Sequence, residues 1–223
     1  MRVSGRRLVL AGVLSTAAVL AGFSVAVRAT PAATAAASAT SQLALHDASR
    51  KLWEDHITWT RCFIVSAGTL STNLPDREPT TARLLQNQVD LGNVIRTYYG
   101  DKAGDDVTAL LTQHILLAAQ IIDSAKAGDT AAEQEAIDAW YDNADQIAVY
   151  LHRLNPQNWS VRALKSLLTQ HLDLTLQEAV DRLNGRYSAD VADYDDVHNE
   201  ILGLADTLSA GIIAQFPDRF ASS

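Results

Sequence analysis

Four histidines, each near the middle of a different apolar helical stretch, are the residues of this sequence best suited to chemistry. They are His56, His114, His171 and His198. Neutral imidazole is a good transition-metal ligand and a good proton carrier. One core histidine is ordinary, but four at similar depth in four helices predict a shared polar site. The other two, His46 and His152, fall at helix ends or margins, so we expect them at the surface or at its boundary with the core.

The stretch after His171 adds two polar residues to the same helical face. Thr175 and Glu178 follow His171 by four and seven residues, so the three side chains form one stripe along a helix. A buried carboxylate is costly without a cation or a hydrogen-bond donor. We therefore predict that Glu178 is a fifth metal ligand or an acceptor for a ligand histidine. Thr175 and Tyr194 would orient the ligands from the second shell around the metal.

Iron, zinc, manganese and copper(II) all suit these ligands, and the residue types do not separate them. Haem is the other cofactor considered, but the sequence lacks Cys-x-x-Cys-His, and Met1 is its only methionine. The single cysteine, Cys62, excludes an intrachain disulfide and a cysteine cage for a metal. Neither the Glu-x-x-His pairs of di-iron bundles nor the His-Glu-x-x-His motif of zinc proteases is present.

The elements that must position these residues are helices throughout. Apolar residues recur with helical period after residue 42, with neither an alternating β pattern nor a repeat of fixed length. The expected helices cover about 43–71, 81–99, 103–127, 129–154, 160–184 and 188–216. Short connections favour antiparallel neighbours. We predict an all-α fold, an up-and-down bundle of four to six helices, ferritin-like or similar, as one domain over 43–217, with a tail over 218–223.

Residues 1–35 have the layout of an export signal. Three arginines precede an apolar run over 8–27, and small residues that suit cleavage follow it. The pair Arg6 and Arg7 also resembles a twin-arginine signal. We expect residues 36–42 to be a flexible lead-in and the protein to be extracytoplasmic, either secreted or attached to the cell envelope. The run is just long enough to span a bilayer if uncleaved, and we expect membrane contact only there.

The charge of the chain limits its partners. The formal net charge is −8, and the acidic residues are scattered, which argues against a nucleic-acid partner. The sequence does not indicate a protein partner. About 180 residues remain after the signal, enough to bury one substantial core.

Three strings of the sequence resemble an uncharacterised family of small, mostly helical bacterial proteins. They read Trp-x-x-His-x-x-Trp-Thr-Arg over 53–61, Trp-Tyr-x-Asn-Ala-Asp over 140–145 and His-Leu-x-Leu-Thr-x-x-Glu-Ala over 171–179. The resemblance covers about 52–217. It implies a helical fold and the importance of these residues, and it implies no activity.

The leading functional prediction is an extracytoplasmic helical bundle that binds a transition metal or haem through core histidines. The first alternative is a structural or partner-binding envelope protein with a buried polar network and no metal. The second is a hydrolase-type enzyme in which His171 and Glu178 form an acid–base pair. No motif in the sequence identifies a reaction, so we favour an enzyme less than a binding or structural protein.

Overall fold

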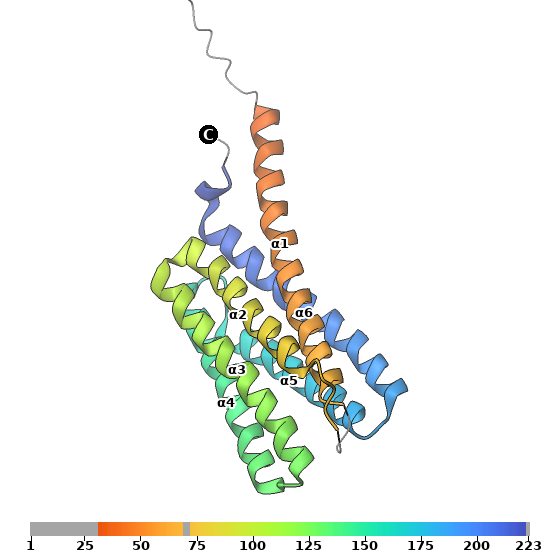
Figure 1. The fold of residues 1–223 in the computed structure, drawn as a ribbon. Helices are drawn as coiled ribbons and strands as arrows, with labels where there is room; N and C mark the ends of the chain where they lie inside the picture. Colours follow the sequence, from red (N-terminus) through yellow and green to blue (C-terminus); the bar gives the residue numbers. More distant parts are fainter. Residues whose placement is uncertain (1–30, 69–71, 222–223) are drawn as a thin grey trace, which may run out of the picture.

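The protein is an all-α bundle, as predicted. The computed structural model describes residues 31–68 and 72–221, and these ranges contain no β-strand. They form six α-helices and a short 3₁₀ helix (Figure 1): α1 (Pro31–Ser66), α2 (Arg77–Tyr99), α3 (Asp101–Ala127), α4 (Thr130–Leu154), α5 (Val161–Leu183), α6 (Tyr187–Gln215) and η1 (Pro217–Arg219).

The six helices form a closed ring. Each helix packs antiparallel against the next one in the chain, and α6 packs against α1. The connections are short: Gly100 alone separates α2 from α3, and its φ of 89° favours glycine. Asp129 caps α4 by accepting a hydrogen bond from the backbone N–H of Ala132. Because neighbours alternate in direction, α1, α3 and α5 run the same way.

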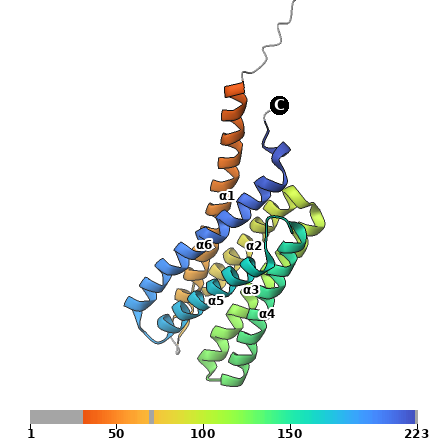
Figure 2. The ribbon, with the colours of Figure 1, turned by 180° about the vertical axis from the view of Figure 1, so that it is seen from behind.

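The first part of α1 projects beyond the ring (Figures 1 and 2). The helix begins at Pro31, whereas the sequence predicted a flexible lead-in over 36–42 and a helix from residue 43. The alanine-rich composition of this segment explains the earlier start, since alanine has the highest helix propensity. Most of the predicted export signal, residues 1–30, lies outside the described residues.

The ring consists of three helical hairpins that repeat one burial pattern: α1–α2, α3–α4 and α5–α6. His56, His114 and His171 are 58 and 57 residues apart on the first helices. On the second helices, the buried Asn87, Asn143 and Glu200 are 56 and 57 residues apart. Apolar positions follow the same spacing, for example Ile95, Leu151 and Leu208. The structure therefore contains a repeat, with a spacing of 56 to 58 residues, that the sequence analysis did not find.

Two apolar clusters fill the ring, and the histidines lie where they meet. The larger cluster includes Trp53, Leu111 and Leu168, each three residues before one of the histidines. The smaller one includes Ile64, Ile122 and Ala179, each eight residues after one. A polar layer therefore crosses an otherwise apolar interior.

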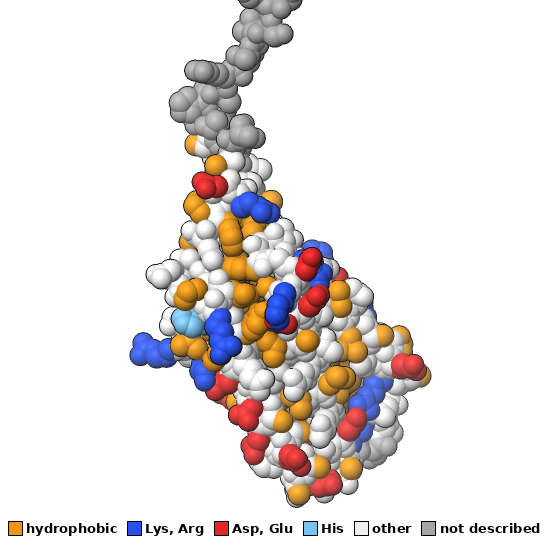
Figure 3. Space-filling model, turned by 90° about the vertical axis from the view of Figure 1, so that its left-hand side faces the viewer, with side chains coloured by type: hydrophobic (Ala, Val, Ile, Leu, Met, Phe, Trp, Pro, Cys, Tyr) orange, Lys and Arg blue, Asp and Glu red, His pale blue; other side chains and the backbone are white. Residues whose placement is uncertain are grey.

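Helix α3 is long and apolar enough to cross a membrane by composition, which the sequence analysis did not anticipate. It packs along both α2 and α4, however, and core helices of bundles pass the same test. On the face in Figure 3, hydrophobic side chains gather in a band below the projecting part of α1, with charged side chains around it.

Candidate metal centre

Three of the four predicted histidines meet inside the ring. His56 on α1, His114 on α3 and His171 on α5 are each at most 4% exposed. The ring centroids of His56 and His171 are 5.7 Å apart, and those of His114 and His171 are 6.5 Å apart. These three residues, the histidine trio, lie at equivalent positions of the three hairpins.

Each imidazole of the trio is held through Nδ1 by the second helix of its own hairpin. The Nδ1 atom of His56 lies 3.4 Å from Nε2 of Gln88, and that of His114 lies 3.0 Å from Oδ1 of Asn143. The Nδ1 atom of His171 lies 3.2 Å from Oε2 of Glu200. No described residue hydrogen-bonds to any of the three Nε2 atoms.

Two of the hairpins share a second contact that the third lacks. The amide of Asn87 donates to the carbonyl of Leu52, and the amide of Asn143 donates to the carbonyl of Leu110, at 3.0 and 3.1 Å. Each carbonyl belongs to the residue four positions before a trio histidine. Glu200 occupies the equivalent place in the third hairpin, so the trio has one carboxyl neighbour and two sets of amide neighbours.

Burial keeps His56 and His114 uncharged near neutral pH. Loss of solvent, followed by repulsion from the other imidazoles, lowers the pKa of His56 well below its usual value. The same causes lower the pKa of His114 to about 3. Neutral imidazole is the form that binds metal ions.

Several buried polar atoms around the trio have no hydrogen-bond partner among the described residues. They include Oε1 of Gln88, Nε1 of Trp140, Oγ1 of Thr175 and Oε1 of Glu200. Gln88 and Glu200 each contact a ring of the trio, and Trp140 lies against His114 with ring centroids 5.1 Å apart. Because an unpaired buried polar atom is unfavourable, their grouping marks this layer as a place for a polar ligand.

Two of the three ring spacings in the trio are close to what a metal ion requires. A tetrahedral ion bound to imidazole nitrogens at about 2.1 Å sets the ring centroids about 5 Å apart. The observed 5.7 and 6.5 Å differ from this by about 1 Å, which side-chain rotation can supply. Within the described ranges, no group of three or more His, Cys, Asp or Glu side chains is already arranged to hold an ion.

The structure places His198 outside the trio. Its side chain is 38% exposed, and its Nε2 lies 3.1 Å from Oε1 of Glu54 on α1. Tyr194, which was predicted to orient the ligands, shares this outer surface, where its hydroxyl lies 3.3 Å from Oγ1 of Thr58. On α6 the buried stripe runs through Val197 and Ile201, and His198 lies beside it.

The structure also places Glu178 away from the trio. Glu178 is buried, two turns along α5 from His171, and it accepts a hydrogen bond from Arg61 at 2.8 Å. Arg61 also pairs with Asp190, which is fully buried. Burial raises the pKa of Glu178 to about 7, against the stabilising effect of Arg61. The carboxylate partner of His171 is Glu200, so the predicted acid–base pair of His171 and Glu178 is not formed.

The remaining sequence expectations concern Thr175 and the two outer histidines. Thr175 is buried one turn after His171, as predicted, and lines an apolar cavity of about 30 Å³. His46 and His152 are half-buried at the margins, as predicted, near Asp206 and the carbonyl of Trp159.

Sequence reasoning missed the residues that hold the trio: Asn87, Gln88, Asn143 and Glu200. One signal was available, because Asn143 lies within the Trp-Tyr-x-Asn-Ala-Asp string. A second signal was the constant separation within the hairpins. In each of them, about 30 residues separate the histidine from its partner near residue 87, 143 or 200. Comparisons of the chain with protein-family models, curated proteins and solved structures found no match.

Proposed function

We propose that this protein binds a divalent transition-metal ion through Nε2 of His56, His114 and His171, and that it works outside the cytoplasm. The observation that carries the proposal is the repeat itself. Each hairpin contributes one buried imidazole at the same level, with a polar side chain against Nδ1 and no hydrogen bond to Nε2 among the described residues. Three such ligands leave a fourth position for water or a small ligand.

The partners of Nδ1 support the same reading. Metal-binding histidines are usually fixed by an acceptor on their other nitrogen, which sets the tautomer and the ring orientation. Asn143 and Glu200 present such acceptors to His114 and His171. Toward His56, the amide nitrogen of Gln88 is a donor, which places the proton of the neutral ring on Nε2. Binding through Nε2 of His56 therefore requires the Gln88 amide to turn and present its unpaired Oε1 to Nδ1. The carboxylate of Glu200 would also offset part of the charge of the ion, because its second oxygen has no other partner.

Metal analysis of protein purified from its export route tests the proposal. We expect one equivalent of iron, zinc, manganese or copper. We also expect chelation to lower the melting temperature, since the metal binds only the folded state. Absence of a stoichiometric metal, together with no rise in melting temperature on adding these ions, would overturn the proposal and favour a metal-free polar network.

Three variants sharpen this test. His114→Gln should abolish stoichiometric binding, whereas His198→Gln, which changes a half-exposed histidine, should leave binding unchanged. Glu200→Gln keeps the size of the side chain and should weaken metal affinity by roughly 10- to 100-fold, as expected for loss of an outer-shell partner. Cobalt(II) titration, followed by its visible absorption bands, gives the affinities. Equal affinities for the wild type and His114→Gln would contradict the proposed ligands.

A further inference from the structure

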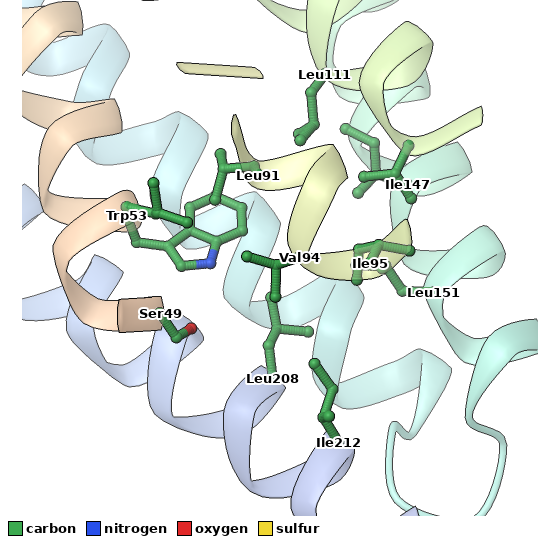
Figure 4. A pocket seen from close by; sticks show the side chains of 12 residues that line it. Ser49, Trp53, Leu91, Val94, Ile95, Leu111, Ile147, Leu151, Leu208 and Ile212 are labelled. Atoms are coloured by element: carbon green, nitrogen blue, oxygen red, sulfur yellow. The ribbon is translucent and has the colours of Figure 1, made fainter. Parts of the chain in front are cut away.

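Two small cavities lie on opposite sides of the histidine trio along the axis of the ring. The first, of about 40 Å³, is on the side of the residues that precede the histidines, such as Trp53, and Figure 4 shows that its walls are apolar except at Ser49. The second, of about 30 Å³, is lined by Thr60, Ala118 and Thr175, among others. Each of these three is four residues after a trio histidine, so the second cavity begins about one helical turn from the trio.

The second cavity is the one whose lining residues carry unpaired polar groups. Trp140 and Thr175 both line it and are at most 5% exposed. Nε1 of Trp140 and Oγ1 of Thr175 have no hydrogen-bond partner among the described residues, whereas no lining residue of the first cavity has such a buried atom. Both groups can donate a hydrogen bond. Because an unpaired buried donor is unfavourable, the two together mark a site for a ligand that accepts hydrogen bonds.

Both donors are departures from the repeat of the hairpins. Where α4 has Trp140, the equivalent positions of α2 and α6 hold Leu84 and Val197. On α1, Thr60 is equivalent to Thr175, but its hydroxyl donates to a backbone carbonyl one turn earlier, at 2.8 Å. The other hairpins therefore pack without a free donor at these positions, so packing alone does not account for the two that are present.

The charge of a loaded centre indicates which kind of acceptor suits these donors. A divalent ion bound by neutral imidazoles would have one carboxylate beside its ligands, that of Glu200, whose Oε2 lies 3.2 Å from Nδ1 of His171. The buried carboxylates of Glu178 and Asp190 are already paired with arginines, of which Arg61 contacts both. The ion and Glu200 together would leave one positive charge in a buried layer, which is unfavourable without an anion.

We propose that the fourth position of the metal ion binds a small monovalent anion, which accepts hydrogen bonds from the indole N–H of Trp140 and the hydroxyl of Thr175. This inference rests on the proposed metal function. Trp140 lies against His114, with ring centroids 5.1 Å apart, and Thr175 is one turn from His171, so both donors adjoin ligands of the ion. The cavity has room for about two water molecules, which limits the anion to about three atoms.

Azide binding to the full chain loaded with cobalt(II) tests the proposal. We expect azide to change the visible absorption bands of the bound cobalt, with one azide bound per protein. In the zinc-loaded, ¹⁵N-labelled protein, azide should also shift the indole N–H signal of Trp140. That signal is assigned as the one of four tryptophan signals that disappears in Trp140→Phe.

Paired variants separate the donors from the packing around them. Thr175→Val removes one donor while keeping the size of the side chain, so it should weaken azide binding by about ten-fold without changing the metal content. Trp140→Phe removes the other donor and should have a similar effect. Thr60→Val makes the same change at the equivalent position of α1, where the hydroxyl is already bonded, and should leave azide binding unchanged.

Glu200→Gln tests the charge argument. It removes the negative charge beside the ligands, so at saturating cobalt it should strengthen azide binding by about ten-fold, although it weakens metal binding. Equal azide affinities for this variant and the wild type would overturn the proposal. Bound cobalt whose bands, together with the Trp140 signal, do not respond to azide would overturn the anion site and leave the metal proposal standing. Failure of the wild type to bind cobalt would overturn both.

Discussion

The two histidines with lowered pKa values make the metal-free protein sensitive to acid. Unfolded histidine takes up a proton below about pH 6.5, whereas His114 stays neutral in the folded state down to its pKa of about 3. The unfolded state therefore binds more protons below pH 6.5. The stabilisation is complete above that pH and is lost as the pH falls toward the folded pKa.

Replacing His114 by Gln tests this linkage. Between pH 7.5 and pH 5, we expect the free energy of unfolding of the metal-free wild type to fall by about 2 kcal/mol more than that of His114→Gln. Urea unfolding at both pH values gives the comparison. The raised pKa of Glu178 changes stability with pH in the opposite direction over this range. Glu178 is present in both proteins, so its contribution cancels in the comparison. Parallel pH profiles for the two proteins would show that His114 is protonated in the fold.

Arg61 is the residue whose loss should be most costly outside the trio. It neutralises Glu178 and Asp190, which are both at most 1% exposed. Removing the cation leaves Glu178 without its cation and Asp190 with only the longer contact to Arg182 at 3.7 Å, so Arg61→Gln should lower the free energy of unfolding by about 3 kcal/mol near neutral pH. Guanidinium denaturation measures it.

Arg50→Gln is the control for this substitution. Arg50 also pairs with an aspartate, Asp206, but both side chains are well exposed to solvent. We expect its stability to stay close to that of the wild type. Similar losses in the two variants would mean that burial of the Arg61 cluster is not what makes it important.

At the scale of elements, the projecting part of α1 contributes little to the bundle. Its residues Ala35, Ala36, Ala39 and Thr40 are exposed, and Ser41 makes the first contact with the C-terminal segment through the carbonyl of Phe220. A chain that begins at Ser41 should therefore keep its melting temperature within a few degrees, as calorimetry would show. A chain that begins at Leu52 loses the buried Leu45 and Ser49 and should melt much lower. Equal melting temperatures would contradict this division of α1.

The helices and the trio could be predicted from periodicity, but the depth of each side chain could not. A helical wheel places His198 beside Val197 and Ile201, yet it does not say which neighbouring helix covers that edge. In the ring, Val197 is buried, whereas His198 lies beside Glu54 of α1 at the surface. Glu178 was placed correctly as buried, but its partner Arg61 lies on another helix, and pairing between helices has no signal in a single wheel.

The repeat escaped sequence analysis because the hairpins share burial rather than residue identity. Leu84, Trp140 and Val197 occupy one position, and only their apolar character is common. Selection for packing preserves volume and polarity at each site within wide limits, so different side chains fill equivalent places. The histidines are the exception, and three identical residues at constant spacing are too few to reveal a period.

At the scale of the whole molecule, the closed ring predicts tolerance to a new pair of chain ends. Ser41 on α1 and Phe220 after α6 are in contact, while the connection at Gly100 is exposed. A circular permutant that joins these ends through a short glycine-rich linker and opens the chain between Gly100 and Asp101 keeps every helix and every interface. We expect it to fold with the same helical content and to retain cooperative unfolding.

Circular dichroism and urea titration check this expectation. A permutant opened inside α3, between Leu111 and Thr112, separates Leu111 from His114 and serves as the control that should not fold cooperatively. Loss of cooperativity in the Gly100 permutant would mean that the order of hairpin formation matters as well as their arrangement.

The number of hairpins in the ring also determines how many ligands the axis can offer. Each hairpin supplies one inward imidazole, and three hairpins bring neighbouring rings to within 5.7 and 6.5 Å. With two hairpins, the same repeat would offer two such imidazoles, and with four it would offer four. The number of hairpins therefore determines the number of inward imidazoles. Gain or loss of a hairpin, by duplication or deletion, would change the two numbers together.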